Sequence, residues 1–195
     1  MAEWKKTALL AGFQIIGEDL ARHGLVSSHG GNLSLRLGER LLITRRGSML
    51  GRLAEKDIMD TGLFANDRAT PLASSELAVH RAIYHESTAL AVVHAHPVHA
   101  VALSLDSDEV VPVDAEGSYL LKRVPVIGRE VIVKTKEVAQ EVALALKEHP
   151  IVIVRGHGSF ATGQLLEEAL HWTTALEESA HILWLRQIQQ AIKGR

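Results

Sequence analysis

The sequence of 195 residues contains no cysteine. This absence excludes disulfide bonds and thiolate chemistry, and it is compatible with the reducing cytoplasm, where we expect the protein to work. Neither sign of charge is in large excess, because the formal net charge is only −2 at pH 7. We therefore expect no nucleic acid as a main partner, since such binding relies on a strong positive charge.

Long apolar runs are also missing. No stretch reaches the roughly 18 uninterrupted apolar residues that indicate a membrane span, and Met1 to Lys6 lacks the cationic-then-apolar shape of a signal peptide. The sequence shows no internal repeat, linker or low-complexity tract. With 47% hydrophobic and 23% charged residues, it suits one globular domain over residues 1–195, with a sizeable core and no membrane partner.

The most informative stretch is a strand that ends in histidines. The run from Ala89 to Val93 is apolar and predicts a buried strand, and His94 and His96 follow it. Alternate residues of a strand point to the same face, so these two imidazoles can share one metal ion. Pro97 cannot donate a ladder hydrogen bond, which predicts that the strand stops there. The pair alone is weak evidence, because the chain has 11 histidines.

His157 supplies a third candidate ligand. It follows the apolar run from Ile151 to Val154, which predicts another strand end, and it is flanked by Gly156 and Gly158. Glycines on both sides allow a close approach of the backbone. Three imidazoles with an open fourth position are the pattern of a catalytic divalent-metal site, of which zinc is the usual occupant.

Hydrophobic periodicity predicts a chain of alternating helices and strands. Helices are expected over about residues 3–23, 76–85, 98–105, 135–148 and 165–193. Strands are expected over residues 33–37, 41–44, 57–64, 89–93, 109–113, 123–127, 151–154 and 159–162. The polar stretch from Asp114 to Tyr119 is interpreted as a loop. His171 and His181 are interpreted as structural residues of the last helix, and the pattern indicates no partner for His80 or His85.

Two glycine-containing segments allow two interpretations each. Gly30 to Asn32 is either an ordinary turn or a phosphate cradle, in which glycines let backbone amides approach an anion. Arg45 to Ser48 is either a solvated pair of charges or a cation and amides that face a phosphate. Spacing alone does not decide between these alternatives.

The start of the predicted helix near residue 76 is equally ambiguous. Ser74 and Ser75 precede it, and a serine there is a good N-cap. A helix N-terminus also binds anions through its free amides and its dipole. Glu76 in the first turn is either an acid that the dipole favours or a general base that faces the metal.

Five motifs occur in one order along the chain: Gly31-Asn32-Leu33-Ser34, Ile43-Thr44-Arg45-Arg46-Gly47, Ser74-Ser75-Glu76, His94-Ala95-His96 and Gly156-His157-Gly158. With them the chain resembles the zinc-dependent class II sugar-phosphate aldolases and the adducin head domain, over nearly its whole length. Within that family it is most similar to the L-fuculose-1-phosphate aldolases. The resemblance implies retro-aldol cleavage of a ketose 1-phosphate to dihydroxyacetone phosphate and an aldehyde.

The same resemblance implies an architecture. The fold would be α/β, a three-layer α/β/α sandwich with a central, largely antiparallel sheet. The assembly would be a homotetramer with active sites at the subunit interfaces. The partner of each site would be a small-molecule sugar phosphate, bound with one zinc ion per subunit.

Site residues are likewise implied by the matching motifs. His94, His96 and His157 match the zinc ligands, and Glu76 matches the catalytic acid/base. Four further residues match positions that hold the substrate phosphate: Asn32, Gly47, Ser74 and Ser75.

Arg46 and Tyr119 stand at points where the chain departs from the family pattern. The position of Arg46 is commonly a small hydroxyl residue, and an arginine there could add a charge-assisted bond to phosphate or carboxylate, or change the substrate. Tyr119 lies near a catalytic tyrosine of the fuculose enzymes without being clearly in register, and Glu116 is about as close. A second family tyrosine, in the C-terminal tail, has no counterpart, because the only other tyrosine is Tyr84.

Three alternatives to the aldolase interpretation remain within this resemblance. A ribulose-5-phosphate 4-epimerase usually has aspartate at the position of Glu76. A sugar-phosphate dehydratase or a decarboxylase is compatible with Glu76, and Arg46 would suit an acid substrate. A non-enzymatic scaffold like adducin need not keep metal ligands, and this chain has all three.

Overall fold

The computed structural model describes residues 3–128 and 135–194. Six α-helices and eight strands lie in this part of the chain. The helices are α1 (Glu3–Arg22), α2 (Leu77–Glu86), α3 (Val98–Ser104), α4 (Ala115–Leu120), α5 (Lys136–Ala145) and α6 (Leu166–Lys193). The strands are β1 (Asn32–Leu37), β2 (Arg40–Thr44), β3 (Ile58–Gly62), β4 (Ala91–Ala95), β5 (Glu109–Val110), β6 (Val124–Ile127), β7 (Ile151–Val154) and β8 (Gly158–Gly163).

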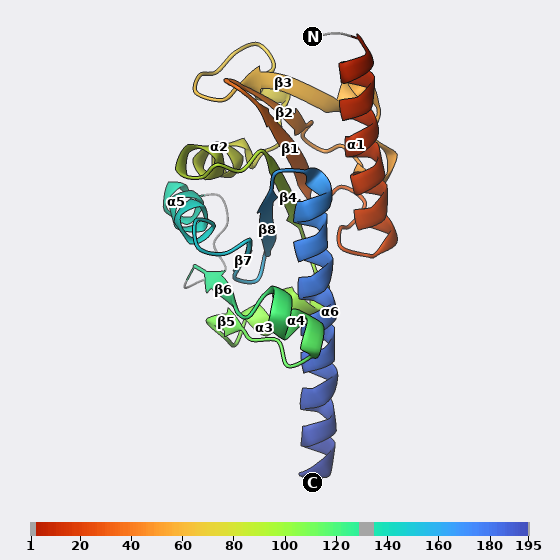
Figure 1. Cartoon of the computed structure of the whole chain (residues 1–195), viewed down its shortest axis with the longest axis vertical. Coiled ribbons are helices and arrows are strands. Elements are labelled where there is room, and N and C mark those ends of the chain that lie inside the picture. Colours follow the sequence, from red (N-terminus) through yellow and green to blue (C-terminus); the bar gives the residue numbers. More distant parts are fainter. Residues whose placement is uncertain (1–2, 129–134, 195) are drawn as a thin grey trace.

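All eight strands belong to one sheet with the order β3-β2-β1-β4-β8-β7-β6-β5 (Figure 1). β6 and β7 pair in parallel, while the other described neighbours pair antiparallel. The sheet is therefore mixed, which corrects the largely antiparallel sheet expected from the resemblance. The reason is the connection through α5, because a helical crossover returns the chain to the same end of the sheet and makes the next strand parallel.

Helices lie on both sides of the sheet, with α2 and α5 on one face and α1 and α6 on the other (Figure 1). The pleat of β4 divides its side chains between these faces. Val93 belongs to the core beneath α1 and α6, whereas Val92 belongs to the core beneath α2 and α5. His94 follows Val92 by two residues, so its ring faces α2.

Most of the expected elements are confirmed within one to three residues of their ends. The first helix, the hairpin of β1 and β2, and the long last helix all occur where the periodicity placed them. Thr135 caps α5 as expected, because its hydroxyl accepts a hydrogen bond of 3.1 Å from the Val138 amide. α5 ends at Ala145, three residues before the expected end.

Three local expectations are wrong. The supposed loop after Asp114 is helix α4, because the Asp114 side chain caps it by accepting from the Gly117 amide at 2.7 Å. Strand β5 keeps only two of its five expected residues, and Pro112, which has no amide hydrogen, follows two residues later. Neither serine before α2 is its cap, since Glu76 holds that position without a side-chain cap bond.

In the described part of the chain, every helix is too short or too polar to traverse a lipid bilayer.

Candidate metal centre

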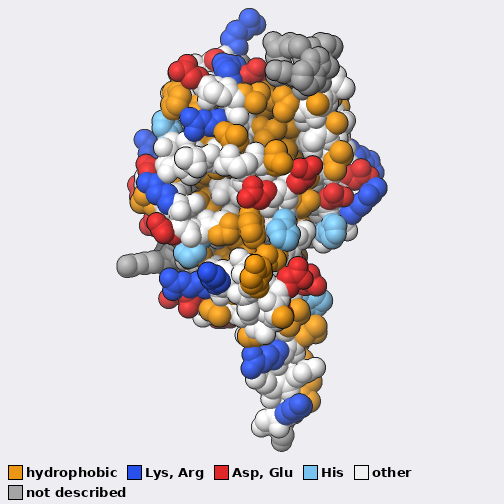
Figure 2. All heavy atoms as spheres, viewed as in Figure 1, with side chains coloured by type: hydrophobic (Ala, Val, Ile, Leu, Met, Phe, Trp, Pro, Cys, Tyr) orange, Lys and Arg blue, Asp and Glu red, His pale blue; other side chains and the backbone are white. Residues whose placement is uncertain are grey.

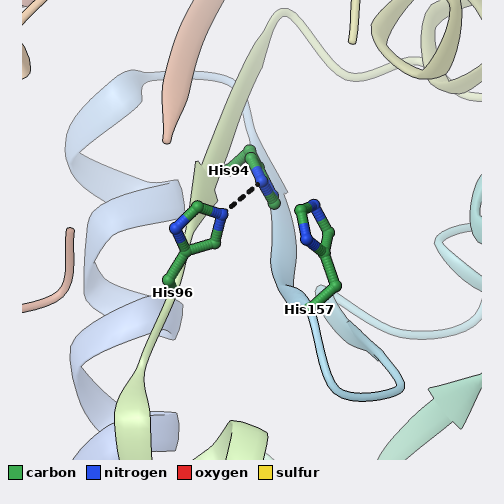
Figure 3. A group of neighbouring side chains, drawn as sticks. All are labelled: His94, His96 and His157. Atoms are coloured by element: carbon green, nitrogen blue, oxygen red, sulfur yellow. Dashed lines mark hydrogen bonds between the residues drawn. The ribbon is translucent and has the colours of Figure 1, made fainter. Parts of the chain in front are cut away.

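Three imidazole rings converge beside the end of β4 (Figure 3). His94 lies in β4, His96 follows it by two residues, and His157 lies in the turn between β7 and β8. One ligand atom of each ring lies within 4.8 Å of the other two, and the Nε2 atoms of His94 and His96 are 3.0 Å apart. The fold thus brings together the two distant segments that the sequence analysis proposed as metal ligands.

A hydrogen bond behind the His94 ring orients it toward the other two histidines. Nδ1 of His94 lies 2.9 Å from the backbone oxygen of Ser159. A carbonyl oxygen only accepts, so Nδ1 donates to it and Nε2 is the ring nitrogen that faces the other histidines. Burial, with the nearby His94 and His157, lowers the pKa of His96 to about 4, which leaves this ring neutral near pH 7. The donor set therefore fits a divalent metal ion.

Two positions beside the rings have no room for a side chain and therefore require glycine. A Cβ atom on Gly158 would lie 2.3 Å from the carbonyl oxygen of Ala95 and 2.6 Å from the His96 ring. A Cβ atom on Gly30 would lie 2.8 Å from Nδ1 of His96. A larger residue at either position would displace a ligand. The glycine loop before Asn32 thus packs on the metal centre, which neither the turn nor the cradle interpretation had included.

Glu76 faces the histidines from the start of α2. Its Oε2 atom lies 2.9 Å from Nε2 of His94, and its Oε1 atom lies 2.9 Å from Nε2 of His157. Only 5% of the residue is exposed. Burial acts to raise the pKa of Glu76, but attraction to His94 and hydrogen bonds with both histidines outweigh it and hold this pKa well below its usual value. The carboxylate is therefore ionised beside the nitrogens of these two histidines.

Strand register places Asn32 beside the same carboxylate. Asn32 pairs with His94 across β1 and β4, so both side chains lie on the sheet face that α2 covers. Nδ2 of Asn32 donates to Oε2 of Glu76 at 2.8 Å, and Oδ1 accepts from Nε2 of His80. Nδ2 has a second hydrogen, which is the group that could reach a substrate phosphate.

His80 is a residue for which the sequence analysis found no partner. It is fully buried, and its ring joins Asn32 to the hydroxyl of Ser34. A signal for this placement was present in the sequence, because Glu76 and His80 are four residues apart and therefore lie on one face of a helix.

The expected phosphate segments are neighbours in the fold. A β-bridge joins Arg45 to Ala73, so the turn from Arg46 to Gly47 runs beside Ser74. Ser74 is buried, and its hydroxyl accepts from the amide of Glu76 at 3.2 Å. These contacts connect the two segments to Glu76, which faces His94 and His157.

The other phosphate candidates lie at the surface. Arg46, Gly47 and Ser75 are exposed, and Gly47 has a φ of +70°, at which a larger residue would be strained. Arg45 binds Asp57 at 3.1 Å. Of the two adjacent arginines, Arg46 is thus the one that faces outward.

Tyr119 lies on a different element from the three histidines and makes none of their contacts in the described structure. It is on α4, is 82% exposed, and α4 packs against α6. Glu116, the alternative proton donor, is also exposed on α4. Within the described residues, neither side chain joins the contacts that connect Glu76, Asn32 and the metal ligands.

The comparisons with known proteins identify the family. The model of the "Class II Aldolase and Adducin N-terminal domain" matches residues 14–184, which contain all three histidines and Glu76. The chain belongs to this family. Class II aldolases are typically metal-dependent, which agrees with the group formed by His94, His96 and His157.

Individual class II aldolase relatives cover most of the chain. The crystal structure of L-fuculose-1-phosphate aldolase from Thermus thermophilus is 41% identical with a TM-score of 0.88, over 94% of this chain and 96% of that one. The 3,4-dihydroxyphthalate decarboxylase of Arthrobacter keyseri is 33% identical over 168 residues, 77% of this chain and 67% of the relative. The methylthioribulose-1-phosphate dehydratase of Acidiphilium cryptum is 32% identical over 176 residues, 83% of each chain. The chain is an enzyme of this class, and its relatives differ in the reaction.

Proposed function

We propose that this enzyme cleaves a ketose 1-phosphate like L-fuculose 1-phosphate to dihydroxyacetone phosphate and an aldehyde, with one zinc ion per subunit. The observation that carries the proposal is the contact of the Glu76 carboxylate with two of the three histidines. An ionised carboxylate there stands next to any substrate group that binds at the metal. The 41% identity with a fuculose-phosphate aldolase structure supports the same reaction.

Glu76 would move the proton of the reaction. When the bond between C3 and C4 of the ketose breaks, the electron pair stays on C3, which must then gain a proton. In the reverse direction the ionised carboxylate of Glu76 removes a proton from C3, and in cleavage it first takes up a proton from water and then delivers it to C3. A divalent metal held by His94, His96 and His157 would supply Lewis acidity toward the carbonyl and hydroxyl oxygens of the substrate.

Tyr119 would exchange the proton of the aldehyde oxygen. Cleavage takes a proton from the C4 hydroxyl, and the reverse reaction returns it. Because Tyr119 is 82% exposed, its side chain is free to enter the site of a neighbouring subunit. This arrangement agrees with active sites at subunit interfaces.

The phosphate would bind away from the reacting carbon, where its binding energy holds the substrate in place. The bridge between Arg45 and Ala73 supports a common pocket, because it joins the two segments concerned. The proposed phosphate ligands are Asn32, Arg46, Gly47, Ser74 and Ser75.

A panel of ketose 1-phosphates tests the reaction. With zinc-loaded enzyme we expect release of dihydroxyacetone phosphate, followed as NADH oxidation by coupled glycerol-3-phosphate dehydrogenase, and fastest with L-fuculose 1-phosphate. Loss of water without cleavage, or release of CO2 from a hydroxylated aromatic acid, would contradict the proposal.

The decarboxylase is the second candidate function. Its support is the 33% identity with a dihydroxyphthalate decarboxylase and the exposed Arg46, since a guanidinium binds a carboxylate as well as a phosphate. The CO2 measurement in the same panel distinguishes it from the aldolase.

Arg46→Ala is expected to weaken the binding of phosphorylated substrate while leaving kcat near the wild-type value. The guanidinium would bind phosphate remote from the broken bond, so its loss acts on binding rather than on the transition state. The rise in KM, and in the inhibition constant of inorganic phosphate, should be largest at low salt, where an exposed charge is least screened.

Arg22→Ala is the matched control, because it removes an exposed arginine at the end of α1. It should change neither constant. If phosphate inhibited Arg46→Ala as strongly as the wild type, Arg46 would be a solvated surface charge and not a phosphate ligand.

We also propose a homotetramer. The C-terminal part of α6 projects from the rest of the molecule, and hydrophobic side chains lie along it (Figure 2). Five of them are at least 37% exposed: Ile182, Trp184, Leu185, Ile188 and Ile192. Burial of these side chains against other copies would remove apolar surface from water. Light scattering at micromolar protein should give four times the chain mass, and a monomer mass would contradict the assembly.

Two broader expectations complete the proposal. The single sheet that connects β1 to β8 supports one domain over residues 1–195. The absence of cysteine supports a cytoplasmic location.

A further inference from the structure

A ladder of five polar side chains runs inward from Glu76. On α2, Glu76, His80 and Tyr84 recur every four residues, which places them about 6 Å apart along the helix. On β1, Asn32 and Ser34 are alternate residues, about 6.7 Å apart on one face. Because the two spacings nearly match, side chains of the strand fit between side chains of the helix.

Each neighbour in this ladder lies within hydrogen-bond distance of the next. Nδ2 of Asn32 is 2.8 Å from Oε2 of Glu76, and its Oδ1 contacts Nε2 of His80. Nδ1 of His80 is 2.6 Å from the Ser34 hydroxyl, which is 2.8 Å from the hydroxyl of Tyr84. All five residues are buried, so water does not compete for these bonds.

The direction of the bonds follows from Glu76. Its carboxylate only accepts, so Nδ2 of Asn32 faces it and Oδ1 faces His80. Oδ1 also only accepts, so Nε2 of His80 carries a proton. Burial lowers the pKa of His80 to about 3, so the ring is neutral and Nδ1 accepts from Ser34. Burial raises the pKa of Tyr84, whose hydroxyl stays protonated and donates to the backbone oxygen of Ser34 at 3.0 Å. The donors of Ser34, His80 and Asn32 therefore point toward Glu76.

We infer that His80 is a positioning residue that fixes Glu76 through Asn32. If the Asn32 amide turned over, its NH2 group would face the N–H of His80 and its oxygen would face the carboxylate. Both contacts would then be lost inside the protein, where unpaired polar groups are costly. The Ser34 hydroxyl donates to Nδ1 of His80 and so stabilises the tautomer that prevents this turn. The inference rests on the proposed function, because it presupposes that Glu76 moves a proton.

His80 also contributes to packing, which its test must separate from positioning. Its ring meets that of Phe160 edge-on, with ring centroids 6.0 Å apart. Phe160 in turn stacks on His94. A loss of activity alone would therefore not distinguish a positioning role from a disturbed core.

The tautomer of His80 can be measured without any substrate. In long-range ¹H–¹⁵N spectra of the zinc-loaded protein near pH 7, the His80 signals, identified by their absence in His80→Gln, should be those of a neutral ring with its proton on Nε2. A proton on Nδ1 of His80 would overturn the inference, because Oδ1 of Asn32 would then have no donor.

The kinetic test compares three substitutions in the ladder. His80→Phe should lower kcat by about 10²-fold, the scale expected from a misplaced catalytic group, with zinc content unchanged. His80→Gln should recover part of this loss, because its amide can still donate to Asn32. Tyr84→Phe removes only the last hydroxyl and should stay near wild type. An unchanged kcat in folded His80→Phe would overturn the inference.

A double substitution separates positioning from a general packing effect. If His80 acts through Glu76, His80→Phe should cause no further loss in a Glu76→Gln background. Losses that multiply would assign His80 to packing. Normal turnover of Glu76→Gln would instead refute the proposed function. Impaired Glu76→Gln beside normal His80→Phe would refute the role of His80 alone.

Discussion

Replacing His96 with alanine is expected to abolish both metal binding and turnover. His96 supplies one of the three nitrogens that lie within 4.8 Å of one another, and its Nε2 is 3.0 Å from that of His94. Two remaining imidazoles cannot complete the ligand set of a catalytic zinc site. The loss of affinity should exceed the roughly 10- to 100-fold that follows removal of a partner behind a ligand. Metal analysis after dialysis, with an assay on the same sample, measures both effects.

His171→Ala is the control for this experiment. His171 is an exposed histidine on α6, and its ring contacts that of Trp172. This variant should keep about one zinc ion per chain and full activity. A His96→Ala protein that holds as much metal as the wild type would refute the ligand assignment.

Glu76→Gln should lower kcat by roughly 10²- to 10⁴-fold, the usual contribution of a group that transfers a proton. An amide of the same shape cannot accept the proton, although it can still occupy the site. The metal should remain, because the three histidines are unchanged. Turnover and zinc content measured on one preparation separate these two effects.

Glu177→Gln gives the matched comparison. Glu177 also contacts a histidine, with its Oε1 atom 2.8 Å from Nδ1 of His99, but it lies on α6 and outside the metal group. It should keep wild-type turnover. If Glu76→Gln turned over at a near-normal rate, another base would be moving the proton, with Glu116 and Tyr119 as candidates.

The shared orientation of His94 and His96 could be predicted from sequence because the strand pattern has a short period. An apolar run ending in His94-Ala95-His96 fixes which two side chains share a face, without knowledge of any distant contact. The place of His157 beside them depends on the pairing of β4 with β8, which a single sequence does not show. The family resemblance supplied that link.

The parts that could not be predicted depend on contacts between distant segments. The parallel pairing of β6 with β7 is decided by where α5 packs. The side-chain patterns of these two strands look like those of any buried strands, so they do not show the direction of pairing. α4 was missed because its six residues carry too few apolar positions to show a period, although the capping Asp114 was visible.

His80 shows how a buried polar residue escapes sequence analysis. Its spacing from Glu76 and Tyr84 is evident in the sequence. Its positioning role depends on Asn32 and Ser34, which lie more than 40 residues earlier in the chain. Only the packing of α2 on β1 shows that helix and strand supply alternating members of one ladder.

Hydrogen exchange into dihydroxyacetone phosphate tests the central claim most directly, because it requires no knowledge of the aldehyde. By reversibility, zinc-loaded enzyme in D2O should replace one of the two hydrogens on C3, the hydroxymethyl carbon, and the ¹H NMR signal of that group should fall by half. Glu76→Gln should slow this exchange by roughly 10²- to 10⁴-fold. Absence of exchange in the wild type, or equal exchange in both proteins, would contradict a metal-assisted aldolase in which Glu76 moves the proton.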